Sequence, residues 1–174
     1  MKTRFWIRAA IIAALYAALT LVWPFSFGQV QIRVSEALCV LPLFTPAAVP
    51  GLFAGCLVSG ILGGAVWFDV ALGSLTTLAA AHCARRLRDR ALPIPLLPPV
   101  LFNAVVVGAV AHFAYAGNPS LSALPISMLA VGAGQTVACV GLGLPLFRLL
   151  SRAPASLWED PDAARCRPPR VPEK

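Results

Sequence analysis

An apolar stretch from Ala9 to Ala84 constrains this chain most, because only three charged side chains interrupt it: Arg33, Glu36 and Asp69. In the whole sequence 59% of residues are hydrophobic and 12% are charged, whereas about a quarter are charged in a soluble domain. A water-facing globule of 174 residues has no room to hide so many apolar side chains. The sequence therefore predicts an all-α integral membrane protein, because several apolar segments approach the roughly 20 residues that a spanning helix needs.

Six apolar segments are candidates for transmembrane helices that form one bundle. We expect spans at residues 4–22, 34–44 (reaching up to 48), 50–66, 69–84, 99–116 and 124–150. The second span is short, and three prolines blur its lower boundary. The basic start resembles a signal peptide, but a Trp-Pro pair replaces the small-residue cleavage site, so we expect a retained first helix. Residues 1–152 are thus predicted to form a six-helix transmembrane domain, and residues 153–174 a disordered cytosolic tail.

Basic residues indicate the orientation of this bundle. Residues 2–8 hold three basic side chains, residues 85–90 hold four, and residues 148–152 hold two. With six spans all three clusters fall on one side, which the positive-inside rule makes the cytosol. Both termini are then cytosolic, and Arg33 is on the outer face. The net charge of +7 reflects this orientation rather than nucleic-acid binding.

The charged residues of the apolar stretch converge near the outer ends of spans two and four. A charge at bilayer depth costs about 2.5–3.5 kcal/mol, so such groups pair, face a cavity or bind a ligand. Arg33 and Glu36 are three residues apart and share a helical face, as do Gln31 and Ser35 at a spacing of four. Two interpretations stay open: the charges neutralise one another at the headgroups, or they line an external pocket with Asp69.

Other polar and aromatic residues allow the same two interpretations. Asn103 and Gln135 lie deeper in spans five and six, where an amide either contacts a ligand or joins helices by a hydrogen bond. Trp67 lies at the outer interface, where it either stacks on a flat ligand or belongs to an aromatic belt. His112 is more simply read as a packed interior histidine than as a ligand contact.

Several kinds of chemistry lack their motifs. The only lysines are Lys2 and Lys174, so the chain has no phosphate-binding loop, and it has neither a GxSxG nor an HExxH motif. Five cysteines are scattered without a CxxC pair, which indicates neither a zinc site nor a disulfide framework. If the protein pumps, the energy comes from a partner or an ion gradient. The alternative is a small membrane enzyme or assembly factor whose outer polar cluster is structural.

Small residues form two stripes on the first span. One stripe consists of Ala9, Ala13 and Ala17, and the other of Ala10, Ala14 and Ala18. A spacing of four residues lets another helix approach closely. The stripes predict either a docking surface for a partner or close packing within the bundle itself.

The segment at residues 27–38, FGQVQIRVSEAL, resembles the signature of the QueT family, the substrate-binding S components of energy-coupling factor transporters. Further matches follow in order: FAGCL at 53–57, DVALGSLTTL at 69–78, LPPVLFNA at 97–104 and GLGLPL at 141–146. The resemblance extends over roughly residues 9–150. It implies a multi-pass protein of the bacterial inner membrane that catalyses no covalent chemistry and needs no cofactor.

The resemblance also implies a ligand, partners and roles for residues. The ligand is a queuosine precursor, a 7-deazaguanine such as preQ1 or queuine, captured outside the cell for ATP-driven uptake. The partners are a transmembrane T subunit, which Ala9, Ala13 and Ala17 would face, and two ATPase subunits. The expected substrate-binding residues are Gln31, Arg33, Glu36, Trp67, Asp69, Asn103 and Gln135. Carboxylates suit the N–H donors of a guanine-like edge, and an arginine or an amide suits its carbonyl. Members of the family often carry Glu where this chain has Gln135, which removes one negative charge.

Overall fold

The structure is a computed structural model, and it describes residues 2–23, 26, 33–115 and 120–153. All elements in these ranges are helical, and none is a strand. In chain order they are α1 (Lys2–Val22), η1 (Val34–Leu43), α2 (Ala48–Leu62), α3 (Trp67–Arg86), η2 (Ile94–Leu96), α4 (Leu97–Phe102), η3 (Asn103–Val107), α5 (Gly108–Tyr115), η4 (Leu121–Ala123), α6 (Leu124–Thr136), η5 (Val137–Leu142) and α7 (Gly143–Ser151). The predictions on Gln31 and on the tail at residues 154–174 lie outside the described residues.

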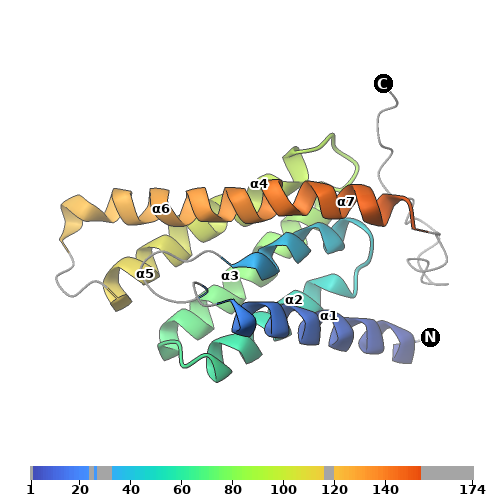
Figure 1. The fold of residues 1–174 in the computed structure, drawn as a ribbon, viewed down its shortest axis with the longest axis horizontal. Helices are drawn as coiled ribbons and strands as arrows, with labels where there is room; N and C mark the ends of the chain where they lie inside the picture. The colour runs from blue at the N-terminus through green and yellow to red at the C-terminus, as the bar shows by residue number, and fades with distance from the viewer. Residues whose placement is uncertain (1, 24–25, 27–32, 116–119, 154–174) are drawn as a thin grey trace.

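These elements make six helical stretches, because η2 through α5 and η4 through α7 each run on as one rod (Figure 1). Three stretches are long and apolar enough to cross a membrane: Thr3–Val22, Ile94–Tyr115 and Leu121–Ser151. The apolar helices η1 and α2 are shorter, at 10 and 15 residues. The prediction of an all-helical fold is confirmed for the described residues, and three of the stretches are candidate membrane spans. A crossing by all six stretches stays a prediction.

The central element is η1, a 3₁₀ helix rather than an α-helix. Nine of its ten residues are buried, so it lies inside the bundle. At about 2.0 Å per residue, ten 3₁₀ residues extend about 20 Å, compared with about 15 Å for an α-helix. This geometry lengthens the short second stretch. At its far end Arg85 Nη1 of α3 donates a hydrogen bond to the Pro42 carbonyl at 2.9 Å.

Two glycines bring α1 against α2. A Cβ atom on Gly51 would lie 2.8 Å from the Ala9 carbonyl oxygen, and one on Gly55 would lie 2.8 Å from the Ala13 carbonyl oxygen. Ala9 and Ala17 are buried, so this stripe of α1 faces the interior of the bundle. Close packing of this kind, in which small residues let backbones approach, is typical of membrane helices.

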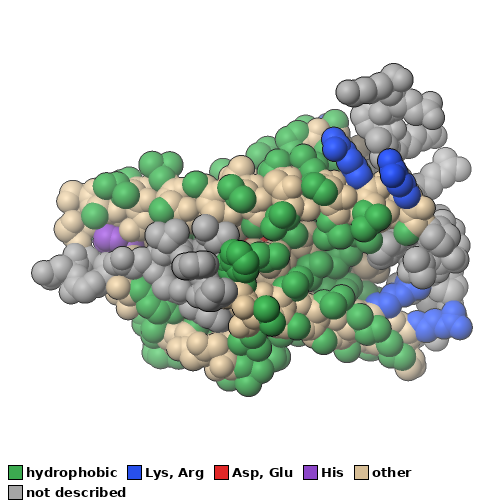
Figure 2. All heavy atoms as spheres, in the orientation of Figure 1, with side chains coloured by type: hydrophobic (Ala, Val, Ile, Leu, Met, Phe, Trp, Pro, Cys, Tyr) green, Lys and Arg blue, Asp and Glu red, His purple; other side chains and the backbone are tan. Residues whose placement is uncertain are grey.

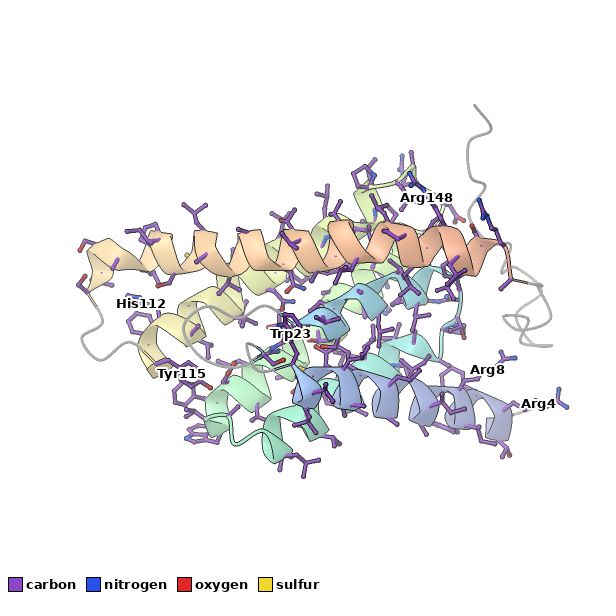
Figure 3. The ribbon with its side chains drawn as sticks, viewed as in Figure 1. Arg4, Arg8, Trp23, His112, Tyr115 and Arg148 are labelled. Carbon is purple, nitrogen blue, oxygen red and sulfur yellow. The ribbon has the colours of Figure 1, made fainter. Side chains whose placement is uncertain are left out.

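The two ends of the molecule carry different polar side chains (Figure 3). Figure 3 places Arg4, Arg8 and Arg148 at one end, and His112 and Tyr115 at the other. The face in Figure 2 is largely hydrophobic, and its Lys and Arg side chains gather at the first end. The grouping in Figure 3 agrees with the predicted orientation, and cytosolic termini stay a prediction.

Candidate functional site

A buried carboxylate, Glu36, lies at the centre of the bundle with 1% of its surface exposed. Its Oε1 accepts a hydrogen bond from the Tyr16 hydroxyl of α1 at 2.6 Å. Its Oε2 accepts hydrogen bonds from the Cys39 thiol at 3.0 Å and from Gln135 Nε2 at 2.9 Å. The donors come from three helical stretches, and each of them is neutral. Within the part of the chain that the structure describes, the carboxylate is therefore held in place by hydrogen bonds without a direct ion pair.

Local helix geometry aims these donors at Glu36. Cys39 follows Glu36 by three residues, and side chains at that spacing eclipse in a 3₁₀ helix. Gln135 is near the end of α6, just before the π-helical segment η5 that contains Cys139. Gln135 Nε2 is also 3.3 Å from Cys139 Sγ, whose thiol lies 3.5 Å from the Glu36 carbonyl oxygen. A π segment of this kind is frequent at functional sites.

The guanidinium of Arg33 lies just before η1 and is 92% buried. Arg33 Nε donates a hydrogen bond to the Ser26 carbonyl oxygen at 3.0 Å, and Nη1 lies 3.8 Å from Cys56 Sγ. Arg33 and Asp69 line the same small cavity, and Glu36 follows Arg33 by three residues. The guanidinium thus supplies the positive charge that two buried carboxylates need.

The second carboxylate, Asp69, is in the first turn of α3 and is 2% exposed. This position favours a negative charge, because the amino end of a helix carries partial positive charge. Asp69 Oδ2 accepts a hydrogen bond from the Tyr115 hydroxyl at 2.9 Å. The same hydroxyl accepts a longer hydrogen bond from the Val66 amide at 3.4 Å. Tyr115 therefore joins the end of α5 to the start of α3.

A small cavity of about 10 Å³ lies beside Arg33 and Asp69, and Glu36 does not line it. It is lined by Arg33, Cys56, Ser59, Gly60, Ala65, Asp69 and Val70. A cavity of this size has room for about one water molecule, whereas pockets for small organic ligands measure about 300–1,000 Å³. In this conformation the polar centre is closed on its own hydrogen bonds. A larger ligand has to replace some of them.

The structure brings together four of the predicted substrate-binding residues: Arg33, Glu36, Asp69 and Gln135. Asn103 is buried in η3, which packs against α3 and α6, and it is not among the residues that line the cavity. Trp67 does not point into the cluster. Its side chain is 78% exposed and meets Phe68 edge to face at 5.6 Å, as in an aromatic belt.

Four residues of this centre were not among the predicted site residues: Tyr16, Tyr115, Cys39 and Cys139. The position of Tyr16 could have indicated a polar contact, because a tyrosine in the middle of an apolar span needs a hydrogen-bond partner for its hydroxyl. The cysteines carry none, since one hundred positions separate them and they form no motif.

His112 has a structural explanation. Its Nδ1 lies 3.0 Å from the Ser127 hydroxyl, and its Nε2 lies 3.1 Å from the Ser120 carbonyl oxygen. Both ring nitrogens therefore have partners outside the cluster. The ring is a buried connector between α5 and the start of the last stretch.

Comparisons with known proteins agree with the resemblance noted above. The model of the QueT transporter family matches residues 6–152, which include every helical stretch of the bundle except the first four residues of α1. A relative from Lactococcus lactis subsp. cremoris (strain MG1363), named "Queuosine precursor transporter QueT", is 36% identical over 92 residues. That alignment covers 51% of this chain and 54% of the relative, so the chain spans about half the length of the curated relative that it matches. No solved structure matches the chain significantly. Because the family match covers most of the sequence, the chain belongs to the QueT transporter family, whose members are transporters rather than enzymes.

Proposed function

We propose that this protein is the substrate-binding component of an energy-coupling factor transporter and captures a queuosine precursor outside the cell. The observation that carries the proposal is the buried centre of two carboxylates and one guanidinium in a QueT-family bundle. Buried charges that are not fully balanced are costly, so a chain that keeps them in a membrane uses them. The ligand class is a 7-deazaguanine nucleobase.

Glu36 is the carboxylate that we assign to the N–H donors of the ligand. Its three partners are neutral, whereas Asp69 lines the same cavity as Arg33. A guanine-like edge offers an N1–H and an amino group next to a carbonyl. Glu36 would accept from the first two, and Arg33 would donate to the carbonyl. A hydrogen bond to a charged group contributes about 1.5–3 kcal/mol.

Opening the site requires the release of Arg33. Its Nε is held by the Ser26 carbonyl oxygen, which belongs to the connection between α1 and η1. A ligand carbonyl would replace the Ser26 carbonyl as acceptor for this guanidinium. We therefore propose that the connection between α1 and η1, which holds Arg33 through Ser26, gates the site.

Gln135 adjusts the charge of the site. It donates to Glu36 Oε2, whereas a glutamate at this position would add a second carboxylate 2.9 Å away. The centre holds two carboxyl groups, Glu36 and Asp69, and one guanidinium, Arg33, so its formal net charge is −1. One protonated amine on the ligand would balance that charge. The charge of the centre therefore favours the aminomethyl precursor, which is a cation, over a neutral deazapurine.

The proposed assembly includes six spans, cytosolic termini, a T subunit and two ATPases in the bacterial inner membrane. The basic residues gathered at one end of the molecule support the orientation (Figure 3). The sequence contains no phosphate-binding loop, so ATP hydrolysis would come from the partners.

The partner surface on α1 is better assigned to a neighbouring stripe than to the predicted one. Ala9 and Ala17 are buried in the bundle, whereas Ala10, Ala14 and Ala18 are exposed at the same spacing. We therefore place the T-subunit contact on the exposed stripe. Ala14→Trp should abolish co-purification with the T subunit and leave ligand binding unchanged. Leu129→Trp on α6, which is equally open to lipid, is the matched control.

Equilibrium binding by the isolated chain tests the proposed function. The purified protein is titrated with 7-aminomethyl-7-deazaguanine, queuine and guanine in detergent micelles. Glu36→Gln should weaken binding about 10- to 150-fold, which corresponds to about 1.5–3 kcal/mol. Trp67→Ala, which removes an exposed aromatic side chain, should bind as the wild type does. Wild-type affinity in both Glu36→Gln and Asp69→Asn would contradict the site assignment.

A further inference from the structure

Two thiols and one carboxylate meet in the middle of the bundle. The ligand atoms of Glu36, Cys39 and Cys139 all lie within 4.8 Å of one another. All three side chains are at least 98% buried. The proposed transport function uses only the carboxylate of this cluster. The thiols make no contact with the proposed ligand, and Cys39 only donates a hydrogen bond to Glu36.

The cluster is held by two packed elements. Glu36 and Cys39 project from one face of η1, and Cys139 projects from the π segment η5. η1 packs against η5, and Gly143, the first residue of α7 directly after η5, lies so close to η1 that a Cβ atom there would lie 3.1 Å from Val40 Cγ1. An ion could thus enter a set of donors that is already assembled.

The donor set selects a class of ion. Thiolates favour soft or borderline metals such as Zn²⁺ and Cd²⁺, whereas Mg²⁺ and Ca²⁺ take oxygen ligands. Zn–S bonds of about 2.3 Å and Zn–O bonds of about 2.1 Å in a tetrahedron place neighbouring ligand atoms about 3.6–3.8 Å apart. The observed limit of 4.8 Å accommodates that spacing with small side-chain shifts.

Neighbouring residues complete the environment. The Tyr16 hydroxyl holds Glu36 Oε1 at 2.6 Å, which leaves Oε2 directed at the thiols. Hydrogen-bonded partners of this kind orient metal ligands. The side chain of Gln135 contacts both Oε2 and Cys139 Sγ, and its amide oxygen supplies a fourth ligand after a flip of the amide. Arg33 offsets the remaining negative charge.

We propose that Glu36, Cys39 and Cys139 form a binding site for one thiophilic dication of the Zn²⁺ class. Both thiols lose their protons when the ion binds, so two protons are released for each ion. The bound ion cross-links η1 to η5 and stabilises the folded bundle, because the same ligands are not assembled in the unfolded chain. The site shares Glu36 with the proposed transport function, but its test depends on the two thiols, which do not contact the proposed ligand.

Cadmium binding to the reduced, full-length protein tests the site. Cd²⁺ is titrated into chelator-free protein in micelles, and thiolate-to-metal charge transfer is followed in the ultraviolet. The wild type should bind one equivalent. Cys39→Ser and Cys139→Ser should each weaken binding by at least about 100-fold, because each removes a ligand rather than an outer partner. Cys56→Ser, which removes another buried cysteine outside the cluster, should retain wild-type affinity.

Cobalt binding to the wild type keeps the test independent of variant folding. Co²⁺ should give the visible and charge-transfer bands of a tetrahedral site with two sulfur ligands. An octahedral, water-like Co²⁺ spectrum would overturn the proposal. Equal Cd²⁺ affinity in Cys39→Ser, Cys139→Ser and the wild type would overturn it as well.

Discussion

Replacing Tyr16 by Phe removes one hydroxyl from the centre of the bundle and leaves the ring in place. The side chain is completely buried, and its hydroxyl donates to Glu36 Oε1 at 2.6 Å. A hydrogen bond to a charged group contributes about 1.5–3 kcal/mol. The carboxylate keeps its bonds from Cys39 and Gln135, so the loss is limited to one bond. We expect the free energy of unfolding to fall by about 1.5–3 kcal/mol.

Tyr115→Phe is the matched control for this prediction. It also removes a tyrosine hydroxyl from a carboxylate, Asp69, at 2.9 Å, but its side chain is only partly buried. Competition from solvent reduces the expected loss to about 1 kcal/mol or less. Both variants can be compared by reversible unfolding in mixed micelles, followed by circular dichroism.

A double-mutant cycle assigns the effect of Tyr16→Phe to the Glu36 contact. The variants Tyr16→Phe and Glu36→Gln should show an interaction energy of at least about 1 kcal/mol, because the residues are in contact. The reasoning is refuted if the two changes are additive, or if Tyr16→Phe costs no more than Tyr115→Phe.

Three further predictions concern packing, capping and charge. Gly55→Ala should destabilise the protein by about 1–3 kcal/mol in an unfolding assay, because its Cβ would meet Tyr16 Cβ at 2.7 Å; Gly141→Ala, whose nearest new contact is 3.9 Å away, should not. Arg85→Gln should cost about 1 kcal/mol through the lost bond to the end of η1 and leave nucleobase affinity unchanged. Gln135→Glu places a second carboxylate beside Glu36, so it should raise affinity for an aminomethyl deazapurine relative to a neutral one; an unchanged ratio would contradict this.

Apolar segment lengths were sufficient to predict the six helical stretches, but not the type of the second one. A 3₁₀ helix and an α-helix of ten apolar residues have similar compositions, and Pro42 was the only visible sign of irregularity. Likewise, both alanine stripes of the first span have the same spacing. Only the position of Gly51 and Gly55 on α2 decides which stripe is buried.

The charged residues of the candidate site could be predicted, because a buried charge has a high free-energy cost in a membrane. Contacts between residues far apart in the sequence could not be predicted. Arg33, Glu36 and Asp69 were identified because a membrane tolerates few charges. The contact of Gln135 with Glu36 joins residues 99 positions apart, and no local pattern encodes it. Trp67 shows the opposite problem, because an aromatic residue at an interface has the same sequence pattern whether it faces ligand or lipid.

The most direct test of the central claim combines the loss of the exocyclic amino group from the ligand with the substitution Glu36→Gln in the protein. Affinities are measured for a 7-deazaguanine and for its analogue without the exocyclic amino group, in the wild type and in Glu36→Gln. If Glu36 accepts a hydrogen bond from that amino group, its removal weakens wild-type binding about 10-fold or more and has little further effect in Glu36→Gln. The same loss of affinity in both proteins, or no binding of either ligand by the wild type, would contradict the account.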